Sequence, residues 1–258
     1  MSSAPPQGER QARAYDRLYL LLASTFSVLL VLTNVIGVKL FQNPLNPSAA
    51  LTAGLITYPL TFLLTDIVSE MYGAKKANDM VYLGFFMSLL MLLVTQVAVA
   101  LPPHAAWVPP ESPFFDTLAD YQQGFASVFA LNGTLLFASM SAYLSAQLID
   151  VWLYHFWKRL TKGRHLWLRN NGSTLFSQLV DTFVVGSLFL VWGLGLDWEL
   201  ATSIMIGNYV VKLLIALLDT PLIYLCVWGI QRRLGPPPAG AEEGASAAED
   251  HSAEHADA

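Results

Sequence analysis

Residues 201–230 read ATSIMIGNYVVKLLIALLDTPLIYLCVWGI, and Lys212 and Asp219 are the only charged side chains among them. A helix needs about 20 predominantly apolar residues to cross the hydrocarbon core of a bilayer. Five further segments meet this requirement, at about residues 18–40, 49–69, 80–101, 127–156 and 174–196. The sequence therefore predicts an all-α polytopic membrane protein with six transmembrane helices.

The composition supports this fold class. Of the 258 residues 54% are hydrophobic and only 13% are charged, whereas a soluble domain carries roughly 25% charged residues. The net charge of −5 comes from the C-terminal segment 234–258, which holds six acidic residues and no Lys or Arg. We expect three regions: an N-terminal segment 1–17, a transmembrane domain 18–233, and this acidic tail, which has too few large apolar residues to fold.

The basic residues predict the orientation. Twelve of the 14 Lys and Arg residues lie in the N-terminal segment, in two loops expected at 70–79 and 157–173, or after residue 230. The positive-inside rule then places both termini in the cytoplasm. The second loop includes Arg169, and we expect Ser173 or Thr174 to cap the helix that follows it.

Several functions are excluded by what the sequence lacks. The single cysteine, Cys226, excludes a disulfide framework and a cysteine-type metal site. The chain has no phosphate-binding glycine loop, no nucleophile elbow and no His/Glu metal pair on a helix, so we expect neither an enzyme nor a bound cofactor or metal. No basic tract suggests a nucleic acid partner. The proline-rich segment 102–125 is expected to be a connector, with a partial lid as the alternative.

Ionised side chains are expensive inside a membrane, so they usually face the bundle interior and are paired or functional. The predicted spans and their ends contain seven: Lys39, Asp66, Glu70, Asp150, Asp181, Lys212 and Asp219.

Helical spacing gathers polar groups into stripes on four spans. The stripes are Tyr58, Asp66 and Glu70; Ser139, Tyr143, Gln147, Asp150 and Tyr154; Thr174, Gln178 and Asp181; and Asn208, Lys212 and Asp219. Such stripes either line a shared polar cavity or hold helices together through hydrogen bonds. The number of charges favours the cavity.

Several sequence motifs, taken in their order along the chain, resemble those of one known family. They are NVIGVKLF at 34–41, PLTFLLTDIVSEMYG at 59–73, QLID at 147–150, and LWLRNN at 166–171 followed by Ser173 and Thr174. They are similar to the queuosine precursor transporter family, also called the vitamin uptake transporter family, over about residues 18–233. The resemblance implies import of 7-cyano-7-deazaguanine and 7-aminomethyl-7-deazaguanine across the bacterial plasma (inner) membrane, for tRNA modification.

The resemblance also implies which ligand the polar stripes would bind. A deazaguanine presents two adjacent N–H donors that one carboxylate can accept. We therefore expect Asp66, Glu70, Asp150 or Asp181 to bind this edge. The remaining candidates complete the polar shell (Asn34, Gln147, Gln178), stack on the base (Tyr58, Tyr143), or serve coupling and gating (Lys39, Asn208, Lys212, Asp219). Lys212 and Asp219 are expected to form a switchable pair.

Two other transport functions stay open. One is a substrate-binding membrane subunit of an energy-coupling-factor importer, which would dock its partner through small residues such as Ala23 and Ser27 on the first helix. The other is a proton-coupled carrier of another vitamin or planar heterocycle. The sequence is also compatible with a homodimer.

Overall fold

The computed structural model describes residues 7–37, 39–42, 50–108, 117–129, 133–193 and 195–237. These described residues contain six α-helices: α1 (Gln7–Ile36), α2 (Tyr58–Ala100), α3 (Leu118–Phe129), α4 (Gly133–Leu160), α5 (Leu166–Gly186) and α6 (Trp198–Leu234). A small antiparallel pair, β1 (Leu40–Gln42) and β2 (Ala50–Thr52), joins α1 to a short 3₁₀ turn before α2. A π-helical segment, Ser187–Gly193, continues α5.

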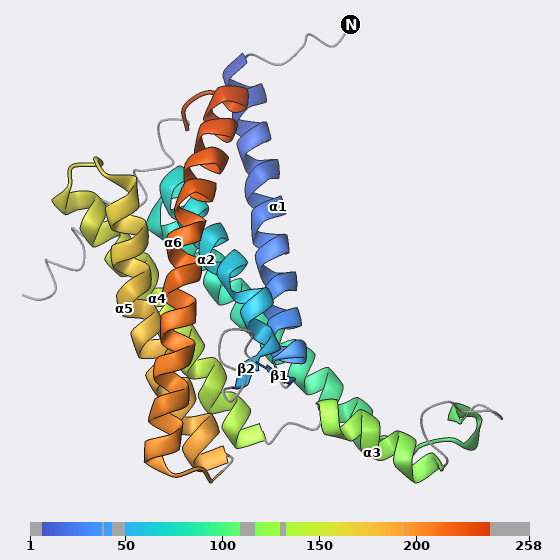
Figure 1. The fold of residues 1–258 in the computed structure, drawn as a ribbon. Coiled ribbons are helices and arrows are strands. Elements are labelled where there is room, and N and C mark those ends of the chain that lie inside the picture. Colours follow the sequence, from blue (N-terminus) through green and yellow to red (C-terminus); the bar gives the residue numbers. More distant parts are fainter. Residues whose placement is uncertain are drawn as a thin grey trace, which may run out of the picture.

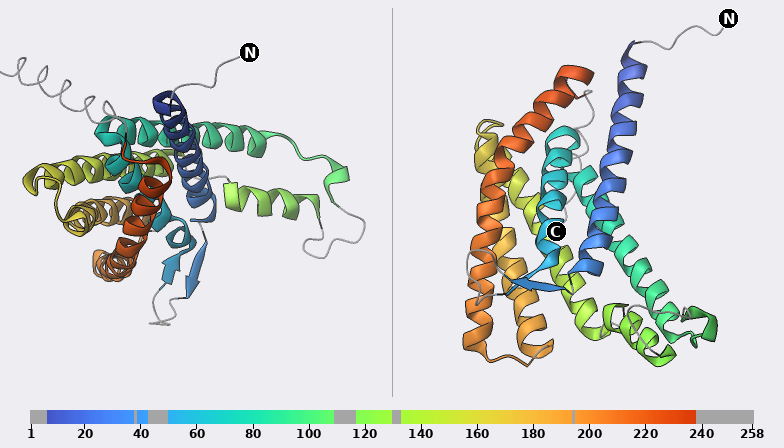
Figure 2. Two further views of the ribbon diagram at one scale, coloured as in Figure 1. Left: turned by 90° about the horizontal axis from the view of Figure 1, so that it is seen from above. Right: turned by 45° about the vertical axis from the view of Figure 1, so that its right-hand side comes forward.

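Helix α2 is two antiparallel arms rather than one long rod. The chain reverses at Gly73, whose φ of 82° and ψ of 174° lie in a region that is essentially restricted to glycine. Figure 1 shows the first arm running away from the β-strands and the second arm returning. In Figure 2 the second arm and α3 project away from the remaining helices. Gly73 therefore makes a helical hairpin out of α2.

Both described ends of the chain lie at the same end of the molecule as this reversal. The Gln11 side chain donates a 2.7 Å hydrogen bond to the Leu234 carbonyl. The Tyr19 hydroxyl donates a 3.0 Å bond to the carbonyl of Lys76, just after Gly73. The connection between α4 and α5 lies at this end too, which we call the termini end (Figure 1). The opposite end, which carries β1 and β2, is the hairpin end.

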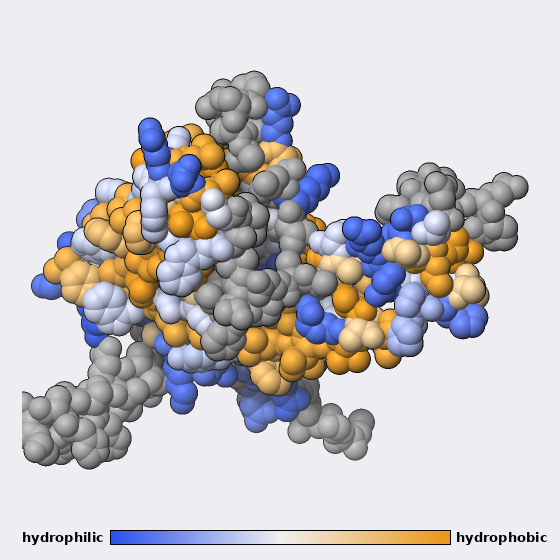
Figure 3. All heavy atoms as spheres, turned by 90° about the horizontal axis from the view of Figure 1, so that it is seen from below, coloured by the Kyte–Doolittle hydropathy of each residue, from blue (hydrophilic) through white to orange (hydrophobic). Residues whose placement is uncertain are grey.

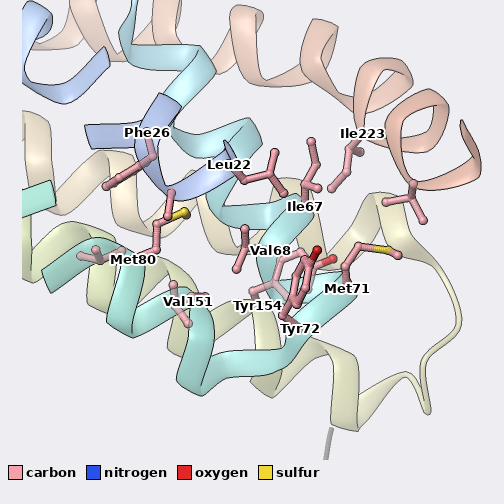
Figure 4. Packing of buried hydrophobic residues seen from close by; sticks show 14 of the residues in the cluster. Leu22, Phe26, Ile67, Val68, Met71, Tyr72, Met80, Val151, Tyr154 and Ile223 are labelled. Atoms are coloured by element: carbon pink, nitrogen blue, oxygen red, sulfur yellow. The ribbon is translucent and has the colours of Figure 1, made fainter. Parts of the chain in front are cut away.

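The main apolar core lies between α1, α2, α4 and α6. Figure 4 shows side chains from all four helices meeting, among them Phe26, Ile67, Val68, Met80, Val151 and Ile223. Gly84 lets α1 approach the second arm of α2, because a Cβ added there would lie 2.5 Å from the Phe26 ring. Phe26 is fully buried, so this close approach leaves no room for a larger residue.

Many large apolar side chains are exposed, as expected of a chain that faces lipid. Leu93, Leu218 and Trp192 are more than half exposed, and Figure 3, seen from below, shows apolar residues interspersed with hydrophilic ones. Four helical segments of the described chain are long and apolar enough to cross a membrane: Gly8–Ile36, Tyr58–Ala100, Leu166–Trp192 and Trp198–Leu234. The chain is an all-α membrane protein.

Helices and loops end at other residues than the predicted spans do. Helix α1 begins at Gln7, so much of the N-terminal segment is helical. The loop expected at 70–79 is reduced to the reversal at Gly73. Neither helix α3 nor the β1–β2 pair was predicted. Windows of apolar residues locate the part of a helix inside the membrane, and a helix can continue past that window wherever helical propensity persists.

The loop expected at 157–173 is also much shorter. Helix α4 continues to Leu160 and α5 begins at Leu166, so Arg169, Ser173 and Thr174 lie inside α5. Neither Ser173 nor Thr174 is a helix cap, and that prediction is wrong. Around Trp107 the proline-rich segment forms only a 3₁₀ turn. Most of the predicted acidic tail, residues 238–258, lies outside the described residues.

Candidate functional site

Buried and half-buried polar side chains from four helices form a continuous column inside the molecule. We call this set the polar column: Tyr58, Asp66 and Glu70 on α2, Tyr143, Gln147, Asp150 and Tyr154 on α4, Arg169, Ser177, Gln178 and Asp181 on α5, and Lys212 on α6. At about 1.5 Å per residue, Tyr58 and Glu70 are about 18 Å apart along the first arm of α2. The column therefore extends over several helical turns, and its contacts divide it into three layers along the helix axes.

The layer nearest the hairpin end is centred on Asp181. Its carboxylate accepts hydrogen bonds from the Tyr58 hydroxyl at 2.5 Å and the Lys212 ammonium at 2.8 Å. The ammonium also lies 4.4 Å from the centre of the Tyr58 ring and 3.3 Å from the Thr182 hydroxyl. This layer joins α2, α5 and α6 through one compensated ion pair.

The layer nearest the termini end is centred on Glu70. Its carboxylate lies 2.6 Å from the Arg169 guanidinium and 3.6 Å from the Lys158 ammonium, and accepts a 3.1 Å hydrogen bond from Tyr154. Arg169 also donates to the Gly163 carbonyl at 2.9 Å. This layer joins α2, α4 and α5 through a second compensated ion pair.

The middle layer holds two carboxylates that form no ion pair among the described residues. Asp150 accepts a 2.8 Å hydrogen bond from Ser177, and its other oxygen, Oδ2, has no described partner. Asp66 Oδ1 likewise has none. Gln147 donates a 2.6 Å bond to the Tyr143 hydroxyl, which leaves its own carbonyl oxygen unpartnered.

A narrow crevice reaches the column beside Lys212. It is lined by residues of α2, α5 and α6, including Tyr58, Gln178, Lys212 and Asp219. Its volume of about 20 Å³ is room for about one water molecule. A bicyclic ligand could therefore enter through this crevice only if α2, α5 and α6 separated.

The structure brings most of the predicted site residues together, and Asp219 joins them on the crevice wall. Three predicted residues lie elsewhere: Asn34 is half-buried on α1, Lys39 is exposed after α1, and Asn208 is half-buried on α6. The predicted Lys212–Asp219 pair is replaced by Lys212–Asp181, because Asp181 on α5 lies opposite Lys212. Whether any of these residues contacts a ligand stays a prediction.

Arg169 is the functional candidate that sequence reasoning missed. It was counted with the basic residues of a loop, yet its side chain is 3% exposed and paired with Glu70. One signal was present: Arg169, Ser173, Ser177 and Asp181 follow one another at four-residue steps. Positions four apart on a helix share a face, so the stripe already recognised on this span could have been extended to Arg169.

Residues 52–226, which include the whole column, match the family model described as "Putative vitamin uptake transporter". The chain belongs to the vitamin uptake transporter family. Membership makes it a transporter rather than an enzyme.

Three bacterial relatives are similar to this family member. The "Probable queuosine precursor transporter" of Bacillus subtilis is 29% identical over 174 residues, which are 67% of this chain and 70% of the relative. The "Queuosine precursor transporter" of Escherichia coli is 26% identical over 185 residues, 69% and 72% of the two chains. A relative from Haemophilus influenzae with the same name as the first is 28% identical over 53% of this chain and 51% of its own. No solved structure matches the chain significantly.

Proposed function

We propose that this transporter imports 7-deazaguanine precursors of queuosine across the bacterial inner membrane, with 7-cyano-7-deazaguanine and 7-aminomethyl-7-deazaguanine as its substrates. The observation that carries the proposal is the polar column, in which buried carboxylates lie between helices of an otherwise apolar membrane protein. The names of the relatives from B. subtilis and E. coli support the same substrate class.

The proposal includes a topology of six membrane crossings with both termini in the cytoplasm. The two arms of α2 supply two crossings, and α1, α4, α5 and α6 supply one each. The basic residues of the termini end support its cytoplasmic location, since Lys and Arg concentrate on that side of membrane proteins. Examples are Arg17, Lys76, Lys162 and Arg232.

The column has the chemistry that such a base requires. A 7-deazaguanine presents N–H donors at its N1 and 2-amino positions, which match carboxylate oxygens. Its ring system can stack on Tyr58 or Tyr143, whose own rings lie 6.1 Å apart. Because the crevice beside Lys212 has room for about one water molecule, transport of such a base requires the column to open toward each side of the membrane in turn.

One alternative loses its main support. A subunit of an energy-coupling-factor importer would use Ala23 and Ser27 to bind its partner, but these residues are 3% and 8% exposed within this chain. Transport by the purified chain alone separates the two functions, because such a subunit would need its partner proteins.

The cellular test uses a bacterium that can neither make nor import the precursor. Expression of this chain should restore queuosine in tRNA when 7-cyano-7-deazaguanine is supplied at low concentration. The control replaces the exposed Asp16 on α1 with Asn and should behave like the unmodified chain. If the unmodified protein reaches the membrane and tRNA still lacks queuosine with either precursor, the proposed substrate class is wrong.

A further inference from the structure

The four carboxylates of the polar column differ in how far their hydrogen-bonding capacity is already used. Glu70 is compensated by Arg169, Lys158 and Tyr154, and Asp181 by Lys212 and Tyr58. A ligand that bound either group would compete with a charged partner already in contact with it. Glu70 and Asp181 therefore act first as links between helices, at the two ends of the column.

Asp66 and Asp150 are in the opposite situation. Their side chains are 2% and 0% exposed, and each keeps one buried oxygen with no partner among the described residues. Neither forms an ion pair among the described residues, because Arg169 is bound to Glu70 at 2.6 Å and Lys212 to Asp181 at 2.8 Å. Buried acceptors in this state require donors.

The column also holds two unpartnered amide acceptors. The carbonyl oxygens of Gln147, in the middle layer, and Gln178, on the crevice wall, are buried without a described partner, and both side chains are at most 2% exposed. Asp66, Asp150, Gln147 and Gln178 thus give this part of the column four unpartnered acceptor oxygens, against buried unpartnered donors at Ser69 Oγ and Arg169 Nε. A ligand that satisfied it would present several donors on more than one edge.

We propose that Asp66 and Asp150 together form the ligand-recognition subsite and select a free 7-deazaguanine base through N–H groups on two of its edges. This inference rests on the proposed function and deepens it. One carboxylate accepts N1–H and a 2-amino hydrogen. The second accepts a hydrogen bond from another edge, where the free base carries its N9–H.

This subsite has consequences for selectivity. An adenine-type base presents a bare ring nitrogen at position 1, which would face a carboxylate lone pair and be repelled. A nucleoside lacks N9–H because the sugar occupies that position. A site built around hydrogen bonds discriminates strongly against analogues that lack the donor, because its buried polar groups are then left unpaired.

The test measures equilibrium binding of radiolabelled 7-cyano-7-deazaguanine to the purified full-length protein in lipid nanodiscs. The variants are Asp66→Asn and Asp150→Asn, which keep side-chain shape, and Asp16→Asn is the matched control on the exposed face of α1. Each column variant should weaken binding about tenfold or more, while Asp16→Asn should bind as the unmodified protein does.

A second series needs no variant and therefore holds even if a substitution prevents folding. The unmodified protein should bind the analogue without the 2-amino group, and the 9-methyl analogue, each about tenfold or more weakly. Both Asn variants binding within about threefold of the unmodified protein would overturn the inference and leave the proposed function standing, as would equal binding of both analogues. Failure of the unmodified protein to bind any deazaguanine would overturn the proposed function itself, and the inference with it.

Discussion

At the scale of single residues, we expect the ion pair between Arg169 and Glu70 to contribute to the stability of the fold. Their side chains are 3% and 16% exposed and their charged atoms are 2.6 Å apart. Removal of one partner from a fully buried pair costs about 3–5 kcal/mol, and loss of Arg169 would leave Glu70 with only the 3.6 Å contact to Lys158 and the Tyr154 hydrogen bond. Arg169→Met should therefore lower the melting temperature of the purified protein substantially.

The double variant Glu70→Gln with Arg169→Met is the control for this prediction. It removes both charges together, so it should melt at a higher temperature than Arg169→Met alone. A melting temperature for Arg169→Met equal to that of the unmodified protein would show that the pair contributes nothing to stability. Both measurements need only thermal unfolding in detergent.

At the scale of single residues, the sequence predicted which acidic residues are buried but not which basic residues pair with them. Asp66, Asp150 and Asp181 stand out because each interrupts an apolar run, and all three are buried in the structure. Arg169 did not stand out, because it follows a basic segment. The partner of Lys212 could not be chosen from spacing either, since Asp219 lies on its own helix and Asp181 on another.

At the scale of elements, the contact between α1 and the second arm of α2 depends on Gly84. A Cβ at this position would lie 2.5 Å from the buried Phe26 ring and 3.0 Å from Leu30. Gly84→Ala should destabilise the protein by about 1–3 kcal/mol, the usual cost of overpacking. Gly229→Ala on α6 meets nothing within 4 Å and should leave the melting temperature unchanged or slightly higher. Equal melting of the two variants would mean that α1 is not packed here as described.

The helices were largely predictable as apolar segments, but their ends were not. A window of hydrophobic residues reports which stretch lies in the bilayer, and α6 illustrates this by extending past both ends of its predicted span to Trp198 and Leu234. The reversal at Gly73 occupies a single residue, which no loop-length expectation anticipates. Helix α3 bonds to the end of α2 through Gln96 and Gln122, contacts that local sequence cannot reveal.

For the whole molecule, the proposed topology can be tested by cysteine labelling. Cys226 is the only cysteine, so Cys226→Ser gives a cysteine-free background. Lys162 at the termini end and Asp197 at the opposite end are both exposed and can each be replaced by Cys. In intact cells an impermeant maleimide should label the cysteine at 197 and spare the one at 162 until the cells are opened. The reverse pattern would invert the orientation.

The most direct test of the account is uptake of radiolabelled 7-cyano-7-deazaguanine by the purified chain in proteoliposomes, without other proteins. The account predicts uptake well above that of empty liposomes for the unmodified protein, and a loss of about tenfold or more for Asp150→Asn, whose carboxylate is fully buried in the column. Uptake by Asp150→Asn equal to that of the unmodified protein would contradict the role of the polar column. Uptake by the unmodified protein no greater than by empty liposomes would contradict the account as a whole.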